Sequence, residues 1–516
     1  MNWINILWVD DEIDLLKPHI LFLKERGYQT TPCSNGRDAL ELLTNKDFDI
    51  ILLDENMPGL NGLETLGELK NIRPNLPVIM ITKNEEEQLM NEAIGAKISD
   101  YLIKPVNPNQ ILHSLKKILN HKNIIAEKTT QNYQKEFREI SLSLAGLDSY
   151  QDWVAYFKKL IYWELELETL DDKSLLEAFE IQLKEANHQF AKFIAENYSD
   201  WLQNSDGPVL SHNVFEKLVL PELKTQQPTL LLMIDNLRYD QWKILAPQLN
   251  EYFSLVSEKA YFSILPTTTQ YARNAFFAGE TPQKISEKFP HWWKNDNDEG
   301  GKNLHEHDLL QVQLKRLGIT RTSSFHKITQ LQQCHQLIKN LANHTHEGIT
   351  TVVYNFVDMI SHAKTEMEVI KELASDSKSY RSLTATWFKN SPLKELLKKA
   401  SELGFQILLT TDHGTVNVGA PSQVIGDKET GINLRYKSGK SLTFEAKDVL
   451  CCENPSAFEL PSFYGINSRY IFARSDAYFV YKNNFNYYAK LFKDTFQHGG
   501  ISLEEMIIPF VVLKGR

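Results

Sequence analysis

Short apolar segments that alternate with stretches of helical periodicity constrain the amino-terminal part of the chain more than any other feature. Each segment has the length and the continuous apolar character of a strand buried on both faces. Alternation of this kind predicts a parallel sheet covered by helices on both sides, as in a doubly wound α/β domain. The expected strands are Ile4 to Val9, Ile50 to Leu53, Val78 to Thr82 and Tyr101 to Ile103.

A chain of 516 residues is too long for a single hydrophobic core. The pattern of apolar and polar residues changes twice along it, which indicates three domains. We expect the first α/β domain over residues 1–120. Residues 121–207 are polar with apolar residues at helical spacing, which predicts an all-α connector, an antiparallel bundle. Residues 208–516 return to strand and helix alternation and predict a larger α/β domain. Its expected strands are Leu230 to Ile234, Thr351 to Val357, Phe405 to Thr410, Tyr470 to Ala473 and Tyr478 to Tyr481.

Composition and charge narrow the class of protein. No apolar run approaches the roughly 20 residues of a membrane helix, and the first residues lack the features of a secretory signal. The four cysteines form neither a disulfide framework nor a paired Cys-x-x-Cys zinc site. A net charge of −10 disfavours non-specific binding to DNA. We therefore expect a cytoplasmic protein without a membrane span and without a direct DNA-binding domain.

Three acids, a hydroxyl and a lysine follow the expected strands of the first domain. In a doubly wound sheet such residues meet beyond the carboxyl ends of the strands. Clustered carboxylates repel one another unless they hold a hard cation such as Mg²⁺. An aspartate beside that cation can accept a phosphoryl group, with a lysine and a hydroxyl near its oxygens. The residues are Asp10, Asp11, Asp54, Thr82 and Lys104, and Asp54 is the expected phosphoacceptor.

Aspartates and histidines also follow the expected strands of the large domain. Carboxylate and imidazole are the usual ligands of hydrolytic zinc, and two zinc ions can clamp a phosphoryl group. Any one of these histidines alone is more often structural, so the prediction depends on their joint occurrence. The predicted ligands are Asp235, Asp358, His362, Asp412, His413 and His498.

A nucleophile is expected in the run Pro266-Thr267-Thr268-Thr269, which precedes a predicted helix over Arg273 to Phe277. Coordination to a metal would activate one of these hydroxyls, and the helix amides would lie near a phosphate. The residues alone leave Thr267, Thr268 and Thr269 open.

The first domain resembles the two-component receiver family over nearly its whole length. The resemblance implies that the backbone carbonyl of Asn56 joins Asp10 and Asp11 in holding Mg²⁺, and that Thr82 and Tyr101 carry the switch. It also implies a sensor histidine kinase as phosphodonor. The matching motifs are Val9-Asp10-Asp11-Glu12, Leu53-Asp54-Glu55-Asn56-Met57-Pro58-Gly59, Ile81-Thr82 and Tyr101-Leu102-Ile103-Lys104-Pro105.

The large domain is similar to the alkaline phosphatase superfamily in its order of acids, threonine and histidines. This implies one zinc ion held by Asp235, Asp412 and His413 beside the nucleophile. A second would be held by Asp358, His362 and His498. The threonine run resembles that of nucleotide phosphodiesterases and implies that Thr269 is the nucleophile.

The whole chain, including the end His498-Gly499-Gly500-Ile501-Ser502-Leu503-Glu504-Glu505, is similar to response regulators with a PglZ domain, of the PorX type. That resemblance implies control of type IX secretion and gliding motility, and a sigma factor as partner.

Two classes of function are compatible with these residues. The first is a phosphodiesterase for a nucleotide or oligonucleotide, gated by phosphorylation and by a phosphorylation-favoured homodimer. A phosphomonoesterase would need a further cation, for which Arg238, Arg273 and Lys437 are the candidates. The second is a phosphorylation-switched binding module without turnover. Direct control of transcription ranks last because no recognition helix follows the receiver. We expect His305 and His307 to lie on the solvated surface.

Overall fold

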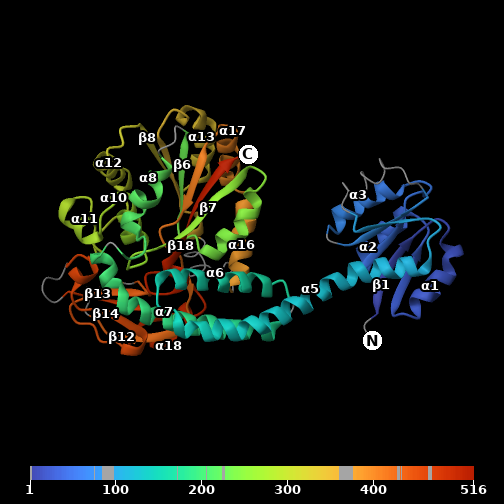
Figure 1. Ribbon diagram of the computed structural model, residues 1–516, viewed down its shortest axis with the longest axis horizontal. Coiled ribbons are helices and arrows are strands. Elements are labelled where there is room, and N and C mark those ends of the chain that lie inside the picture. Colours follow the sequence, from blue (N-terminus) through green and yellow to red (C-terminus); the bar gives the residue numbers. More distant parts are fainter. Residues whose placement is uncertain are drawn as a thin grey trace. The chain divides into compact units, whose positions relative to one another are not determined.

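A computed structural model describes residues 3–74, 76–83, 98–170, 172–204, 206–223, 227–359, 376–426, 431, 433–462 and 468–516, without the side chains of 120–127. The described chain forms two compact units, residues 1–136 and 137–516 (Figure 1). Helix α5 (Pro108–Ser143) begins in the first unit and ends in the second.

The first unit contains a five-stranded parallel sheet with strand order β2-β1-β3-β4-β5. Alternate side chains of β1 enter two separate cores, Leu7 and Val9 on one face and Ile6 and Trp8 on the other. The predicted doubly wound receiver fold is therefore confirmed. Its elements are β1 (Ile4–Val9), η1 (Ile13–Leu16), α1 (Lys17–Lys24), β2 (Tyr28–Cys33), α2 (Gly36–Asn45), β3 (Ile50–Asp54), α3 (Gly62–Ile72), β4 (Val78–Thr82) and β5 (Asp100–Ile103).

Helices dominate the start of the second unit, as predicted for the connector. After α5 and η2 (Leu144–Gly146), helices α6 (Tyr150–Leu167) and α7 (Lys173–Gln203) run side by side (Figure 1). Ser149 and Asp172 accept hydrogen bonds from the first free backbone amides of these helices and so fix where each begins. Trp153 on α6 packs edge-on against Phe190 on α7, which joins the two helices through aromatic contacts.

The second unit is built on a six-stranded sheet with strand order β7-β18-β10-β6-β9-β8. Strands β10, β6, β9 and β8 are parallel to one another, whereas β18 and β7 are antiparallel to their neighbours. The carboxyl ends of β6 and β10 therefore lie next to each other. The strands are β6 (Thr229–Ile234), β7 (Phe253–Phe262), β8 (Ser323–Ile328), β9 (Ile349–Tyr354), β10 (Gln406–Thr410) and β18 (Ile507–Gly515).

The expected strand from Thr351 to Val357 is wrong at its end. Strand β9 stops at Tyr354, because Tyr354 pairs with the last residue of β6 on one side and of β8 on the other. Residues 356–359 are helical, so Asp358 lies beyond the strand end on a helical turn.

The second unit contains further helices and strands, several of which are labelled in Figure 1. The helices are η3 (Ser211–Asn213), η4 (Phe215–Val219), α8 (Leu220–Glu222), α9 (Tyr239–Leu245), η5 (Ala246–Leu249), η6 (Thr269–Arg273), α10 (Asn274–Ala278), α11 (Pro282–Lys288), α12 (Glu306–Arg316), α13 (Leu331–Asn340), η7 (Leu341–His344), α16 (Ser377–Asn390), α17 (Pro392–Glu402), η8 (Ala446–Asp448), η9 (Pro455–Phe458), α18 (Phe485–Phe492) and α19 (Leu503–Met506). The strands are β11 (Val416–Asn417), β12 (Ala420–Val424), β13 (Tyr436–Gly439), β14 (Val449–Cys452), β15 (Arg469–Ala473), β16 (Ala477–Tyr481) and β17 (Phe496–Gln497).

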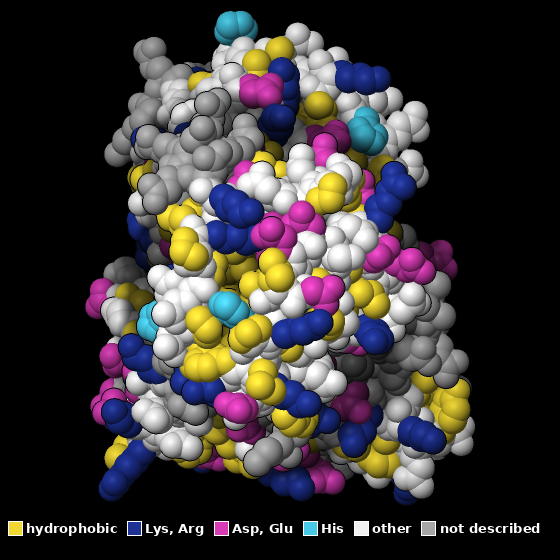
Figure 2. All heavy atoms as spheres, turned by 90° about the vertical axis from the view of Figure 1, so that its right-hand side faces the viewer, with side chains coloured by type: hydrophobic (Ala, Val, Ile, Leu, Met, Phe, Trp, Pro, Cys, Tyr) yellow, Lys and Arg dark blue, Asp and Glu magenta, His cyan; other side chains and the backbone are white. Residues whose placement is uncertain are grey.

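The surface mixes side chains of opposite charge. On the face drawn in Figure 2, the described Lys and Arg side chains alternate with Asp and Glu and do not gather into one basic stripe. None of the described helices is both long enough and apolar enough to cross a lipid bilayer.

Candidate functional site

The predicted acid pocket of the receiver forms at the carboxyl ends of β1, β3 and β5. Carboxylate oxygens of Asp10, Asp11 and Asp54 lie within 4.8 Å of one another, a spacing that can hold a metal ion. The Lys104 ammonium is 2.9 Å from Asp10 Oδ2 and 3.0 Å from Asp54 Oδ1. Burial raises the pKa of Asp54 to about 6, against the lowering effect of Lys104. The pocket therefore concentrates negative charge that only partly finds a counter-charge within the protein.

The other predicted receiver residues surround this pocket. Asn56 is exposed two residues after Asp54. The buried Thr82 hydroxyl donates to the carboxylate of Glu55 rather than to Asp54. Tyr101 is partly buried on β5 and packs against the apolar core of this unit.

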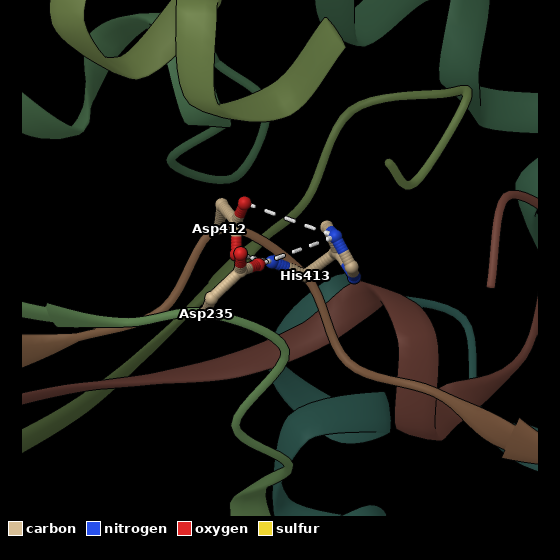
Figure 3. Close-up of side chains that lie close together, drawn as sticks. All are labelled: Asp235, Asp412 and His413. Atoms are coloured by element: carbon tan, nitrogen blue, oxygen red, sulfur yellow. Dashed lines mark hydrogen bonds and ion pairs between the residues drawn. The ribbon is translucent and has the colours of Figure 1, made fainter. Parts of the chain in front are cut away.

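In the second unit, the ends of β6 and β10 bring three predicted ligands together. Asp235 directly follows β6, whereas Asp412 and His413 follow β10, and all three are buried. His413 Nε2 lies 3.8 Å from Asp412 Oδ2 and 4.0 Å from Asp235 Oδ1. Figure 3 shows the imidazole facing both carboxylates. Three donor atoms within 4.8 Å of one another can hold one metal ion.

The hydroxyl of Thr269 joins this group. Its Oγ1 is 3.1 Å from His413 Nε2 and 3.4 Å from Asp235 Oδ1. The neighbouring threonines differ, because Thr267 Oγ1 donates to the backbone oxygen of Gly500, and Thr268 Oγ1 is buried without a hydrogen-bond partner in the described chain. Thr269 begins the π-helical turn η6, a type of turn that is frequent at functional sites.

Arg273, one turn after Thr269, is buried against the ligand carboxylates. Its guanidinium pairs with Asp235 Oδ2, and its Nε lies 3.0 Å from Asp412 Oδ2. Glu306 at the start of α12 completes the surroundings, 3.3 Å from Nη1. Sequence reasoning named Arg273 only as a candidate cation for a monoester, not as a partner of the ligand carboxylates, and it missed Glu306. Arg273 lies four residues after Thr269, about one helical turn, and this spacing could have placed it near the same site.

The pKa values of the two aspartates move in opposite directions. Burial, opposed by Arg273, holds the pKa of Asp235 well above its usual value. Burial also raises the pKa of Asp412, but Arg273 and His413 outweigh it, so that this pKa lies below its usual value. Arg273 favours the ionised form of both carboxylates, and at Asp412 the positive charges around it outweigh burial.

Asp358 and His498 form a second group next to the first. His498 Nε2 is 3.8 Å from Asp358 Oδ1, and the His498 ring stacks on that of His413 with centroids 4.3 Å apart. Asn236, which sequence reasoning also missed, donates from Nδ2 to Asp358 Oδ1 at 3.3 Å. The predicted ligand His362 lies outside the described residues.

Arg238 and Lys437 both make contacts of their own, away from the ligand carboxylates. Arg238 is buried and paired with Asp240. Lys437 is buried on β13, where it donates to the backbone oxygen of Gly431 at 2.7 Å. Burial lowers the pKa of Lys437 to about 7, so its positive charge is itself weakened near neutral pH.

Known proteins match this chain in three consecutive stretches. The family described as a response regulator receiver domain matches residues 6–116. The PorX response regulator linker domain matches residues 123–202. The BREX system PglZ alkaline phosphatase-like domain matches residues 214–513, more than half of the chain.

Individual similar proteins match about a quarter of the chain. The transcriptional regulatory protein ZraR of Escherichia coli O157:H7 is 33% identical over 142 residues, which are 28% of this chain and 32% of that protein. A CpxR homolog from Haemophilus influenzae is 35% identical over 117 residues, 22% of this chain and 50% of that protein. The structure of the chemotaxis protein CheY4 of Vibrio cholerae is 27% identical, with a TM-score of 0.22, and covers 22% of this chain and 98% of that one.

The chain thus spans about a third of the length of the first curated relatives it matches. Receiver, linker and PglZ domain follow one another in the order of PorX-type regulators. The chain belongs to the PglZ family of alkaline phosphatase-like proteins, as a response regulator of the PorX type.

Proposed function

We propose that this response regulator is phosphorylated on Asp54 by a sensor histidine kinase and thereby controls a zinc-dependent phosphodiesterase in its PglZ domain. The observation that carries the proposal is the Thr269 hydroxyl, 3.1 Å from His413 Nε2 and 3.4 Å from Asp235 Oδ1. We propose a nucleotide or oligonucleotide as substrate. The proposed domains are residues 1–120, 121–207 and 208–516.

The donor set fits zinc. Tetrahedral zinc with bonds of about 2.0 Å needs ligand atoms about 3.3 Å apart. The donor atoms of Thr269, Asp235 and Asp412 lie 3.1, 4.0 and 3.8 Å from His413 Nε2, close enough for small movements to complete a site. Asp358 and His498, with His362, would hold a second ion. Bound zinc would supply Lewis acidity at the phosphoryl oxygens.

Thr269 is the proposed nucleophile. Attack of its oxygen on phosphorus would displace one ester oxygen, and water would then release the phosphoryl group from the threonine. Arg273 holds the carboxylates of Asp235 and Asp412, and it thereby fixes Asp235 beside the Thr269 hydroxyl and Asp412 beside His413. The buried surroundings strengthen these electrostatic contacts.

We propose a diester as the preferred substrate class because, among the described residues, none of the cations that the sequence suggested is left to meet the additional charge of a monoester. Each of the three cations that the sequence suggested is occupied. Arg273 is shared by three carboxylates, Arg238 pairs with Asp240, and Lys437 donates to a backbone oxygen.

One observation favours the rival function, a binding module without turnover. Arg273 already compensates the charge of Asp235 and Asp412 from within the protein. A pocket neutralised in this way can persist without metal and could recognise a partner such as a sigma factor. In either case we propose a phosphorylation-favoured homodimer and a role in type IX secretion and gliding motility, by resemblance to PorX-type regulators.

Substitution of the proposed nucleophile tests turnover. We expect Thr269→Val to lower hydrolysis of a chromogenic phosphodiester by at least about a thousandfold, because nucleophile removal eliminates the covalent route. Thr268→Val is the matched control and keeps activity, since the Thr268 hydroxyl has no partner to lose. Wild type is expected to prefer the diester over the corresponding monoester. Activity retained in Thr269→Val but lost in Thr268→Val would move the nucleophile by one residue.

Metal analysis separates the two candidate functions. Wild type dialysed against zinc is expected to hold two ions per chain, and His413→Gln to lose at least one of them. His305→Gln is the control, because His305 is partly exposed, pairs with Asp308 at 2.9 Å and stacks on Trp292, away from the predicted ligands. Elemental analysis measures the number of zinc ions per chain. A wild type that retains no zinc favours the binding module.

Phosphorylation is tested with beryllofluoride and Mg²⁺. We expect these to raise the sedimentation mass of wild type from one chain to two, because the acyl phosphate analogue favours the associating conformation. Asp54→Asn should not respond, whereas Asp47→Asn, an exposed acid that pairs with Arg73, should respond like wild type. A mass that stays constant in wild type contradicts the proposed dimer.

A further inference from the structure

Two buried polar contacts join the connector helices to the loops that carry the proposed metal ligands. One runs from α6 through Arg381 on α16, and the other runs from α7 through Asn187. We propose that Arg381 and Asn187 are positioning residues, through which the connector sets the geometry of the catalytic loops and passes on the phosphorylation state of the receiver. The inference rests on the proposed function, because it assigns the regulation of that same site.

Arg381 is buried between α6 and α9. Its Nη2 lies 2.8 Å from Glu164 Oε1 and also pairs with Glu168, which directly follows α6. Its Nη1 pairs with Asp240 on α9. One cation thus serves carboxylates from two separate helices. Because an uncompensated buried charge is costly, α6 and α9 are constrained to move together.

Asp240 continues this contact to the first metal-ligand loop. Its Oδ1 accepts a hydrogen bond from Arg238 Nε at 2.8 Å, and Arg238 lies three residues after the ligand Asp235. Between them, the backbone amide of Asn236 donates to Asp412 Oδ1 at 3.3 Å. A shift of α6 that is carried to α9 through Arg381 would therefore reach two ligand carboxylates through one short loop.

Asn187 forms the corresponding contact on α7. Its Oδ1 accepts from the backbone amide of Leu503 at 2.7 Å, and its Nδ2 donates to Glu504 Oε2 at 3.0 Å. All three residues are buried, or nearly so. A single amide side chain thus binds both the backbone and a side chain of α19.

Helix α19 lies directly against the residue that follows His413. The backbone amide of Gly414 donates to the backbone oxygen of Glu505 at 3.1 Å. A Cβ atom on Gly414 would lie 1.9 Å from the backbone oxygen of Glu504, so the two segments touch without room for a side chain. A displacement of α19 is therefore passed to His413.

The end of α5 is attached to the same helix as Asn187. Gln182 Nε2 donates to the backbone oxygen of Phe137 at 3.1 Å and to Ser141 Oγ at 2.9 Å, both on α5. Gln182 precedes Asn187 by five residues on α7. Since α5 also supplies the last helix of the receiver, a change in α5 has a covalent and hydrogen-bonded route to α19.

The test uses the full chain with Asn187→Ala and the charge-conserving Arg381→Lys. A lysine keeps the buried charge but cannot bridge both helices as the planar guanidinium does. Gln189→Ala is the matched control, because the side-chain hydrogen bonds of Gln189 stay within α7. Diester turnover is measured at saturating zinc, with and without beryllofluoride and Mg²⁺. The visible spectrum of the cobalt-substituted proteins reports ligand geometry without turnover.

We expect both variants to lower kcat about tenfold or more with little change in KM, as loss of a contact supporting metal ligands does. In both variants, beryllofluoride should change kcat little or not at all. In Gln189→Ala, it should change kcat as much as in wild type. A merely structural role would instead lower the active fraction, leaving the beryllofluoride response and the cobalt spectrum of the folded protein unchanged. The inference is contradicted if both variants have the kcat of wild type and if beryllofluoride changes that kcat as it does in wild type.

The outcomes for wild type keep this inference separate from the proposed function. If wild type hydrolyses the diester but beryllofluoride does not change its turnover, the coupling is contradicted and the proposed phosphodiesterase activity is not. Absence of turnover contradicts the proposed phosphodiesterase activity. The cobalt spectra then test the coupling by themselves. A shift with beryllofluoride in wild type and Gln189→Ala, but not in Asn187→Ala, supports the coupling. Equal spectra in all proteins contradict it.

Discussion

Burial of one guanidinium among three carboxylates determines how the hydrolase half of this chain is assembled. Arg273 pairs with Asp235 from the end of β6, with Asp412 from the end of β10 and with Glu306 from α12. None of these charges could be buried alone, because each would lose its hydration without compensation. The loops after two central strands must therefore form together with the turn that carries Thr269. The same arrangement leaves His413 facing the threonine hydroxyl.

Because the ligand loops depend on buried polar pairs, the geometry of the site depends on the residues that hold these loops in place. A loop held by a few buried polar contacts moves when those contacts move, and two of the contacts come from the connector helices. On this proposal, phosphorylation at Asp54 and hydrolysis at Thr269 would be coupled by the connector alone. The coupling would require connector helices with two arrangements, each favoured by one phosphorylation state.

Regular patterns were predictable from the sequence, whereas long-range pairs were not. Continuous apolar runs identified β1, β3, β4, β6 and β10, and the acids after them converge as expected. Strand β2 was missed because it lies at the edge of the sheet and contains Pro32 among polar residues. The end of β9 was misplaced because two further apolar residues, Phe356 and Val357, follow Asn355 beyond the last paired residue. Asn187 and Glu504 are 317 residues apart, and no local spacing reveals such a pair.

Diffraction from crystals of the zinc-loaded protein at the zinc absorption edge shows directly whether the site holds zinc. We expect two anomalous peaks, one among Asp235, Thr269, Asp412 and His413 and the other beside Asp358 and His498. Arg273 should remain paired with the carboxylates behind the first peak. Absence of anomalous density at this site, with Arg273 alone between the carboxylates, would contradict a zinc-dependent enzyme.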